Sequence, residues 1–228
     1  WLHGVDMLHR LGRGEAVVLA WIEAAPQLAR ELGDDVLGDV ATACAGFASR
    51  TSGAVIARIV ATAPLAARRL GDTGLFAGYL RFLDHLLSRA PRALRPMLDR
   101  LDELLDVLSL GGLRRWADWG AEAHRADPAE LARYFALESA ESRAVLQRER
   151  KGTLLVDVQR RLGMYLRALW GRDFAIAPTA GDFESRAGLR PHVAGGALCL
   201  PDALDDWAGV PALDLYRAQA AHLAAHLD

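Results

Sequence analysis

Cysteine is scarce in this sequence. Only two of the 228 residues are cysteines, Cys44 and Cys199, and each lies in an apolar stretch. A disulfide framework needs more cysteines, and a structural zinc site needs Cys or His residues in closely spaced pairs. We therefore expect both side chains to be reduced and buried in the core of a cytoplasmic protein.

A strong net charge and a long apolar run are missing as well. The chain has 27 basic and 29 acidic residues and a net charge of -2, so charge indicates neither nucleic acid nor an anionic membrane as a partner. Lysine occurs only at Lys151, a bias that is typical of a GC-rich genome. No window approaches the ~20 consecutive apolar residues that a membrane span requires. We expect a cytoplasmic protein that neither spans a membrane nor binds nucleic acid.

Neither end of the chain resembles the end of a complete protein. The sequence begins at Trp1, without an initiator methionine or a signal peptide, and it ends at Asp228 inside a helical pattern. We expect it to be a piece of a longer protein that continues beyond Asp228.

The motifs of several common enzyme classes are also absent. The sequence has no phosphate-binding P-loop, no G-x-G-x-x-G after a strand and no G-x-S-x-G nucleophile elbow. Three acids, Asp202, Asp205 and Asp206, precede the last expected helix, where carboxylates commonly cap a helix and complement its dipole. We therefore expect a protein that is not an enzyme, with no catalytic residue, no cofactor and no resident metal.

One pair of histidines has the spacing of a metal site. His222 and His226 lie four residues apart, on one face of a helix, and zinc metalloproteases use this spacing in H-E-x-x-H. Leu223 stands where those enzymes carry the glutamate that activates water, so the region resembles in outline a metalloprotease scaffold without its chemistry. We favour two histidines on a partly exposed terminal helix. A non-catalytic metal site and a metal-binding, hydrolase-like domain are the alternatives.

An internal repeat organises the first half of the chain. Residues 25–34 (APQLARELGD) recur as residues 63–72 (APLAARRLGD), with seven of ten positions identical at an offset of 38 residues. A period near 40 residues in an all-helical pattern indicates helical hairpins stacked as a solenoid, as in HEAT or armadillo arrays. The alternative to a specialised role is a general protein-binding scaffold of this kind.

The two copies carry a proline, a glycine and an acid at matching positions: Pro26, Gly33 and Asp34, then Pro64, Gly71 and Asp72. The proline suits the first turn of a short helix, the glycine suits the left-handed position that ends it, and the acid suits the cap of the next helix. We expect those next helices over residues 35–49 and 73–89. A third unit is expected to open at Pro96, with a further helix after Gly111-Gly112.

The pattern changes near residue 127. A capping box at residues 127–130 (DPAE) predicts a helix to about Leu137, and Ser139 is placed to cap a second helix that runs to Gly152. A long helix from Leu154 to Trp170 should end at Gly171.

Short strands are expected after that helix. Residues 174–176 are one candidate, and residues 192–194 and 197–200 flank Gly195-Gly196 as a hairpin. Residues 178–182 have turn chemistry, and Pro211 should open a last helix. The fold class predicted is mainly α: a HEAT/armadillo-like solenoid over residues 1–127, then a small α+β region with a short antiparallel sheet over residues 128–228.

Arginine is concentrated around the expected long helix. Such a run is most often a solvated face. The more specific alternative is a docking surface for an acidic partner. The run comprises Arg143, Arg148, Arg150, Arg160, Arg161, Arg167 and Arg172.

Residues from about 110 onward resemble the CbbO/NorD family, in the region that precedes its von Willebrand factor A domain. The similar stretches are 109–116 (SLGGLRRW), 144–152 (AVLQRERKG), 156–162 (VDVQRRL), 165–174 (YLRALWGRDF), 178–184 (PTAGDFE), 200–203 (LPDA) and 215–218 (LYRA). The usual family pattern has serine where this chain has Ala180.

The resemblance implies an adaptor of MoxR-type AAA+ ATPases. Members of the CbbO type link a hexameric ATPase ring to Rubisco, and those of the NorD type act on nitric oxide reductase; we favour the CbbO type. Both types use a D-x-S-x-S metal site in the A domain. This chain contains no such motif, so client recognition through that site is assigned to no residue here.

Overall fold

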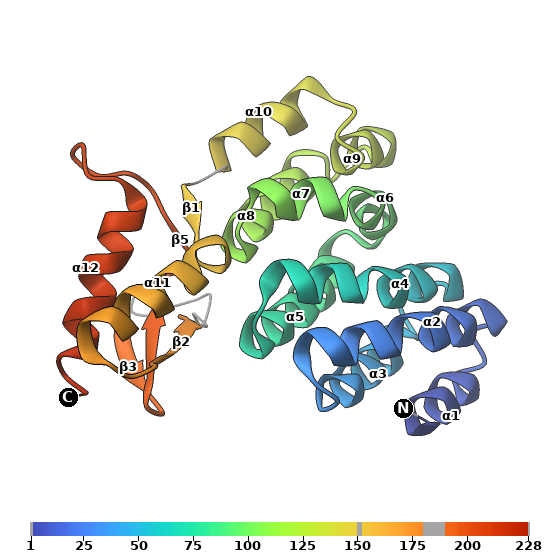
Figure 1. Cartoon of the computed structure of the whole chain (residues 1–228). Coiled ribbons are helices and arrows are strands. Elements are labelled where there is room, and N and C mark those ends of the chain that lie inside the picture. Colours follow the sequence, from blue (N-terminus) through green and yellow to red (C-terminus); the bar gives the residue numbers. More distant parts are fainter. Residues whose placement is uncertain (1, 150–151, 180–189, 228) are drawn as a thin grey trace. The chain divides into compact units, whose positions relative to one another are not determined.

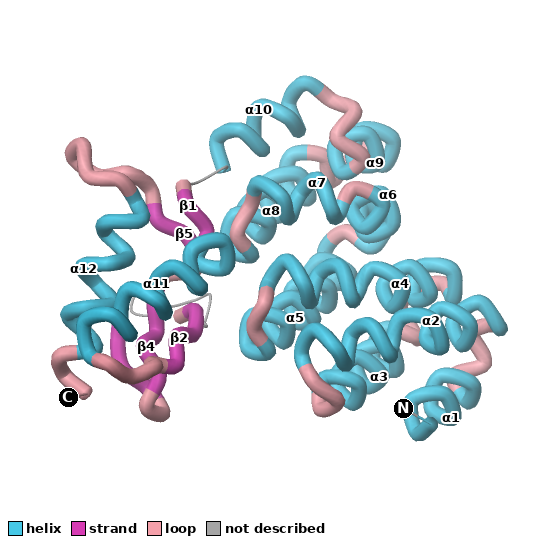
Figure 2. Tube along the Cα trace, in the orientation of Figure 1, coloured by secondary structure: helices cyan, strands magenta, loops and turns pink. Residues whose placement is uncertain are grey.

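The computed structural model describes residues 2–149, 152–179 and 190–227, and these form two compact units. The repeat unit comprises Trp1–Glu149 and the sheet unit comprises Arg150–Asp228. Figure 2 shows that strands occur only in the sheet unit, among the residues described. A mainly helical chain with a small sheet region near its C-terminal end is confirmed. The packing divides the chain after Glu149, not after residue 127.

The helices of the repeat unit form two rows. One row is α2, α4, α6 with α7, and α9; the other is α1, α3, α5, α8 and α10, with neighbours in each row in contact. Figure 1 shows the stack running from α1 to α10. The bounds are α1 Leu2–Arg10, α2 Glu15–Leu32, α3 Val36–Phe47, α4 Gly53–Leu70, α5 Thr73–Arg89, the 3-10 turn η1 Pro91–Ala93, α6 Leu94–Asp99, α7 Leu101–Val107, α8 Leu110–Ala123, α9 Pro128–Phe135 and α10 Ala140–Glu149.

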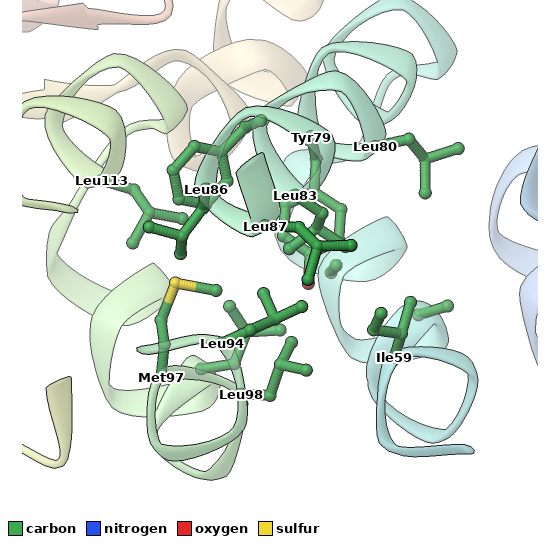
Figure 3. Close-up of a cluster of buried hydrophobic side chains, with 14 of the residues drawn as sticks. Ile59, Tyr79, Leu80, Leu83, Leu86, Leu87, Leu94, Met97, Leu98 and Leu113 are labelled. Atoms are coloured by element: carbon green, nitrogen blue, oxygen red, sulfur yellow. The ribbon is translucent and has the colours of Figure 1, made fainter. Parts of the chain in front are cut away.

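The repeat is clearer in the positions of the helices than in the amino-acid sequence. Helices α3, α5 and α8 begin at Val36, Thr73 and Leu110, two equal intervals of 37 residues. Successive repeats are joined by an apolar core in which α5 packs against α4, α6 and α8. Figure 3 shows this core, where the leucines of α5 meet Ile59 of α4, Met97 of α6 and Leu113 of α8. Each repeat therefore buries its apolar side against the next one.

Ion pairs repeat along the two rows at matching positions. Each pair joins a basic residue of one repeat to an acid of a neighbouring repeat. They include Arg50 with Asp84, Arg89 with Glu122 (2.9 Å), Arg115 with Glu149 (2.7 Å), Arg68 with Glu31 (3.3 Å) and Arg69 with Asp102 (3.3 Å). Apart from the pair with the nearly buried Glu149, these exposed pairs contribute only ~0–1 kcal/mol each, so packing supplies most of the stability and the pairs favour one register.

The role predicted for the two prolines is wrong. Pro26 and Pro64 lie inside α2 and α4, not at the start of short helices. A proline inside a helix costs about 3 kcal/mol. Here the apolar stripe continues past it, with Trp21 and Leu28 buried on either side of Pro26. Burial of that stripe outweighs the lost hydrogen bond, so the helix runs on.

The predicted helix ends are mostly confirmed. Gly71 ends α4 in the left-handed conformation (φ 66°), and Asp72 caps α5 by accepting from the Leu75 N–H at 2.9 Å. Gly33 also ends its helix at positive φ (91°), although in a more extended conformation. The cap predicted for Asp34 is wrong, because α3 begins after Asp35 with no side-chain cap.

Of the other predicted helix starts, some are confirmed and some are wrong. Asp127 and Ser139 cap α9 and α10 as predicted, through bonds from the Glu130 and Ser142 N–H groups. Pro96 lies inside α6, because Pro91 already opens the preceding 3-10 turn. Ser109 caps α8, so this helix begins before Gly111-Gly112.

A closed hydrogen-bonded network attaches α9 and α10 to α8. The Tyr134 hydroxyl donates to the Trp116 carbonyl (2.9 Å), and the two rings stack with centroids 5.0 Å apart. The Ser142 hydroxyl donates to the Tyr134 carbonyl (2.6 Å), and the Trp116 indole N–H donates to the Ser142 carbonyl (3.2 Å). All three side chains are buried, so this satisfied network places α9 and α10 in the repeat unit.

Glu149, at the end of α10, is a nearly buried acid. Its side chain is 11 % exposed and accepts hydrogen bonds from Arg115 (2.7 Å) and Arg148 (3.2 Å). Burial alone would raise the pKa of this carboxyl, but the two arginines outweigh it and lower the pKa below its ordinary value of 4.5.

The described residues of the sheet unit form two helices and two small sheets. Its elements are β1 Thr153–Leu154, α11 Leu155–Trp170, β2 Ala175–Pro178, β3 His192–Ala194, β4 Ala197–Leu200, β5 Ala203–Leu204 and α12 Ala212–Ala224. The end of α11 at Gly171 (φ 69°) and the hairpin of β3 and β4 are confirmed. The larger sheet is mixed, not antiparallel throughout, because β2 pairs with β4 in parallel. A second, antiparallel sheet joins β1 to β5. Of the turn predicted at residues 178–182, residues 180–182 lie outside the described residues.

Both helices pack on the larger sheet and on each other. Leu162 and Leu166 of α11 share a core with Leu198 and Leu200 of β4. Tyr216 of α12 is fully buried, and its hydroxyl donates to the Pro201 carbonyl at 2.9 Å. Because these side chains face the core, the opposite sides of α11 and α12 face solvent.

The Tyr134 packing makes Gly120 a sensitive position. A Cβ at Gly120 would lie 2.2 Å from the Tyr134 ring, which its hydrogen bonds hold in place. We expect Gly120→Ala to lower the free energy of unfolding by ~1–3 kcal/mol in urea titration. Gly38→Ala is the matched control, because its Cβ meets nothing within 4 Å; added helix propensity should stabilise it by up to ~1 kcal/mol. Equal effects of the two variants would contradict the packing.

Glu149→Gln tests the buried carboxylate. The folded-state pKa of Glu149 is lowered, so its stabilisation is present above the ordinary pKa and is lost as the pH falls through the folded value. We expect the variant to be less stable at pH 7 by ~1.5–3 kcal/mol, since a charged hydrogen bond is lost. We also expect its disadvantage to shrink in urea titrations from pH 6 to pH 3. Glu122→Gln, whose acid is 64 % exposed, should cost less than ~1 kcal/mol.

Candidate interaction surfaces

An exposed tryptophan lies on a tight turn between β5 and α12. Trp207 is 71 % exposed, and Val210 beside it is 38 % exposed. The two residues exchange backbone hydrogen bonds, from the Trp207 N–H to the Val210 carbonyl (3.0 Å) and back (2.8 Å). Between them, Ala208 and Gly209 both have positive φ, 49° and 81°. The turn is thus a closed two-residue hairpin loop that presents a large apolar ring to solvent.

Both ends of this turn are attached to the sheet unit. On one side, Leu204 of β5 pairs with Thr153 of β1. On the other, the Asp206 carboxylate accepts from the Ala212 N–H at 2.8 Å, which caps the first turn of α12. The indole is therefore held on a braced segment and not on a free loop.

The capping role predicted for the three clustered acids is confirmed for Asp206. Asp205 is exposed, and Asp202 is partly buried, with its carbonyl accepting from the Leu155 N–H at 3.0 Å.

The outer face of α11 combines arginines with apolar side chains. Arg160 and Arg161 are exposed, and neither forms an ion pair or hydrogen bond within the described residues. Met164, one turn further along on the same side, is 59 % exposed. We call these three residues the α11 face. A basic surface with an apolar centre suits a partner that carries acidic and apolar groups together.

The remaining arginines of the run do not form one surface. Arg143 donates to the Leu137 carbonyl and Arg148 to Glu149, both in the repeat unit. Arg167 pairs with Asp173 at 3.6 Å, while Arg172 donates to the Leu227 carbonyl at 2.9 Å. Arg150 lies outside the described residues. The run is continuous in sequence, but only its middle part contributes to the α11 face.

The two histidines lie side by side at the end of α12. Their Nε2 atoms are 3.4 Å apart and both rings are exposed. Within the described ranges there is no group of three or more His, Cys, Asp or Glu side chains that could hold a metal ion.

Both cysteines are buried, as predicted. Burial raises the pKa of the Cys44 thiol to about 12, so this side chain remains protonated and unreactive at neutral pH. Cys199 is on β4. None of the described helices is both long enough and apolar enough to cross a membrane.

Trp207 was not predicted from the sequence as a binding residue. Residues 205–211 (DDWAGVP) contain turn-forming residues, but they lack the Asn-Gly or Asp-Gly pair that most strongly predicts a two-residue loop. The available signal was a tryptophan next to two acids in a segment with no helical or strand periodicity.

The chain was compared with protein-family models, with curated proteins and with solved structures. No family model matches it, and neither a curated protein nor a solved structure matches it.

Trp207→Ala tests whether the indole has a structural role. Because the ring is mostly exposed, we expect its removal to change the free energy of unfolding by less than ~0.5 kcal/mol. Tyr216→Phe is the matched control in the same unit, since it removes a buried hydroxyl that donates to Pro201 and should cost ~1–3 kcal/mol. A large loss of stability in Trp207→Ala would show that the turn serves the fold.

Proposed function

We propose that this chain is a non-catalytic adaptor region of an AAA+ activation system, which links a MoxR-type ATPase ring to a client enzyme. Rubisco is the favoured client, and nitric oxide reductase is the second. The stretches that resemble the CbbO/NorD family fall largely on α8, α10 and α11. A stacked array of helix pairs also offers the extended surface on which proteins commonly bind other proteins.

The observation that carries the binding role is the exposed Trp207 turn. Tryptophan is among the residues that most often dominate the energy of protein interfaces, usually by filling a pocket of the partner. Burial of a large apolar side chain contributes ~1.5–3 kcal/mol. The closed and braced turn also reduces the conformational entropy that binding would remove. A mostly exposed indole on a braced turn therefore favours a role in binding a partner.

The α11 face supports the same proposal by its charge. Arg160 and Arg161 attract an acidic partner, and Met164 lies within one helical turn of both. Charged groups at such a surface mainly raise the association rate and select the partner, while the apolar centre contributes affinity.

The direct test is to measure binding of a purified MoxR-type ATPase hexamer and, separately, of each client. Trp207→Ala should weaken binding of the ATPase or of a client at least tenfold. A tenfold loss of affinity corresponds to ~1.4 kcal/mol. Leu19→Ala is the control, since Leu19 is similarly exposed (59 %) but lies on α2 of the repeat unit.

A charge reversal tests the α11 face in the same assay. Arg160→Glu with Arg161→Glu should lower the association rate and weaken its dependence on salt. Arg30→Glu with Arg81→Glu changes the net charge equally, at exposed positions of α2 and α5. Equal effects of the two double variants would leave only a general charge effect and remove the α11 face from the proposal.

The same measurements separate the adaptor from a general protein-binding scaffold. Binding of the ATPase and of a client supports an adaptor. If a client binds without any affinity for the ATPase, the general scaffold is the correct description. If neither binds, the adaptor proposal fails.

A further inference from the structure

The side chains of His222 and His226 converge in a way that their spacing alone does not require. Their Nε2 atoms are 3.4 Å apart, the ring centroids are 4.8 Å apart, and the rings are perpendicular (89°). In a tetrahedral zinc site with Zn–N distances of ~2.05 Å, two imidazole nitrogens lie ~3.3 Å from each other. A right-angled site with similar bond lengths needs ~2.9 Å. The observed separation fits two ligands of one tetrahedral ion.

The backbone of the final turn holds both rings on the solvent side. Leu223 is buried and Leu227 packs on the same core, so the histidine that precedes each leucine faces outward. Beyond the end of α12 the turn continues through bonds from the His226 N–H to the Leu223 carbonyl and from the Leu227 N–H to the Ala224 carbonyl. Arg172 donates to the Leu227 carbonyl and fastens this turn to the segment after α11.

The position at the end of a helix also favours a cation. The last carbonyl groups of a helix carry a partial negative charge, which stabilises positive charge within the final turn. His222 is in the last turn of α12, and His226 is the second residue after the end of that helix. Imidazole is a preferred ligand for zinc, nickel and copper, whereas magnesium and calcium prefer oxygen.

We infer that His222 and His226 form a two-histidine binding site for a divalent transition-metal ion, with zinc favoured by the tetrahedral separation. Two coordination positions are left for solvent or for a side chain of a binding partner. Leu223 stands where zinc metalloproteases carry their glutamate, so that position supplies no general base beside the ion. The ion would join the last turn of α12 to His226, beyond the end of the helix, and stabilise this part of the sheet unit.

The test is isothermal titration of zinc chloride into untagged, metal-free protein. We expect one zinc ion per chain, and a rise in the melting temperature with zinc concentration because the ion binds the folded state. His222→Gln and His226→Gln should each weaken binding at least ~10-fold, since even the loss of a supporting partner of a ligand has that effect. Without zinc, both variants should have the melting temperature of the wild type, because the two rings are exposed.

His192→Gln is the matched control. It removes another exposed histidine of the sheet unit, on β3, and should leave zinc binding unchanged. Cobalt(II) serves as a spectroscopic substitute, since it absorbs strongly in the visible range only when four-coordinate. Failure of the wild type to bind zinc, or equal binding by the His222→Gln/His226→Gln double variant, overturns the inference. Weak cobalt absorption would overturn its tetrahedral geometry.

Discussion

A helix pair of the repeat unit cannot bury its apolar side alone, and the architecture of the unit follows from this constraint. Helix α5 illustrates it, because Tyr79, Leu83 and Leu86 are buried only through contacts with helices before and after it in the chain. Short helices have little stability of their own in water, so tertiary packing must supply it. The helix that follows α5 shows the same effect. It is divided at Arg100 into α6 and α7, yet α7 still packs on α4 and is joined to it by the ion pair of Arg69 with Asp102.

The same constraint explains which parts of the fold could be predicted. Features that depend on a few adjacent residues were predicted well, such as the hairpin at Gly195-Gly196, the end of α11 at Gly171 and the cap at Asp127. Features that depend on distant contacts were not. Local chemistry alone argues for a helix start at Pro26, and only packing against the neighbouring repeat reveals that α2 continues through it. The parallel pairing of β2 with β4 joins strands separated by a long connection, which no local pattern encodes.

The candidate surfaces show the same limit. A run of arginines in the sequence predicted one basic face, but the structure pairs several of them and leaves Arg160 and Arg161 without a described partner. The spacing of His222 and His226 was visible, whereas the separation of their nitrogen atoms depends on how Leu223 and Leu227 anchor the turn. The exposure of Trp207 could be seen only in the three-dimensional structure. Its turn places Ala208 at φ 49°, a conformation that sequence patterns assign to glycine.

The equal intervals between α3, α5 and α8 have a consequence for how such a chain changes over generations. Each repeat contacts mainly the repeats before and after it, so a segment of 37 residues can be removed or duplicated only if the two surfaces brought together fit. The cross-repeat ion pairs would not re-form at such a junction by themselves, because the residues 37 positions before Asp102 and Glu122 are Leu65 and His85. The length of the repeat unit can therefore change only together with the residues at its new junction.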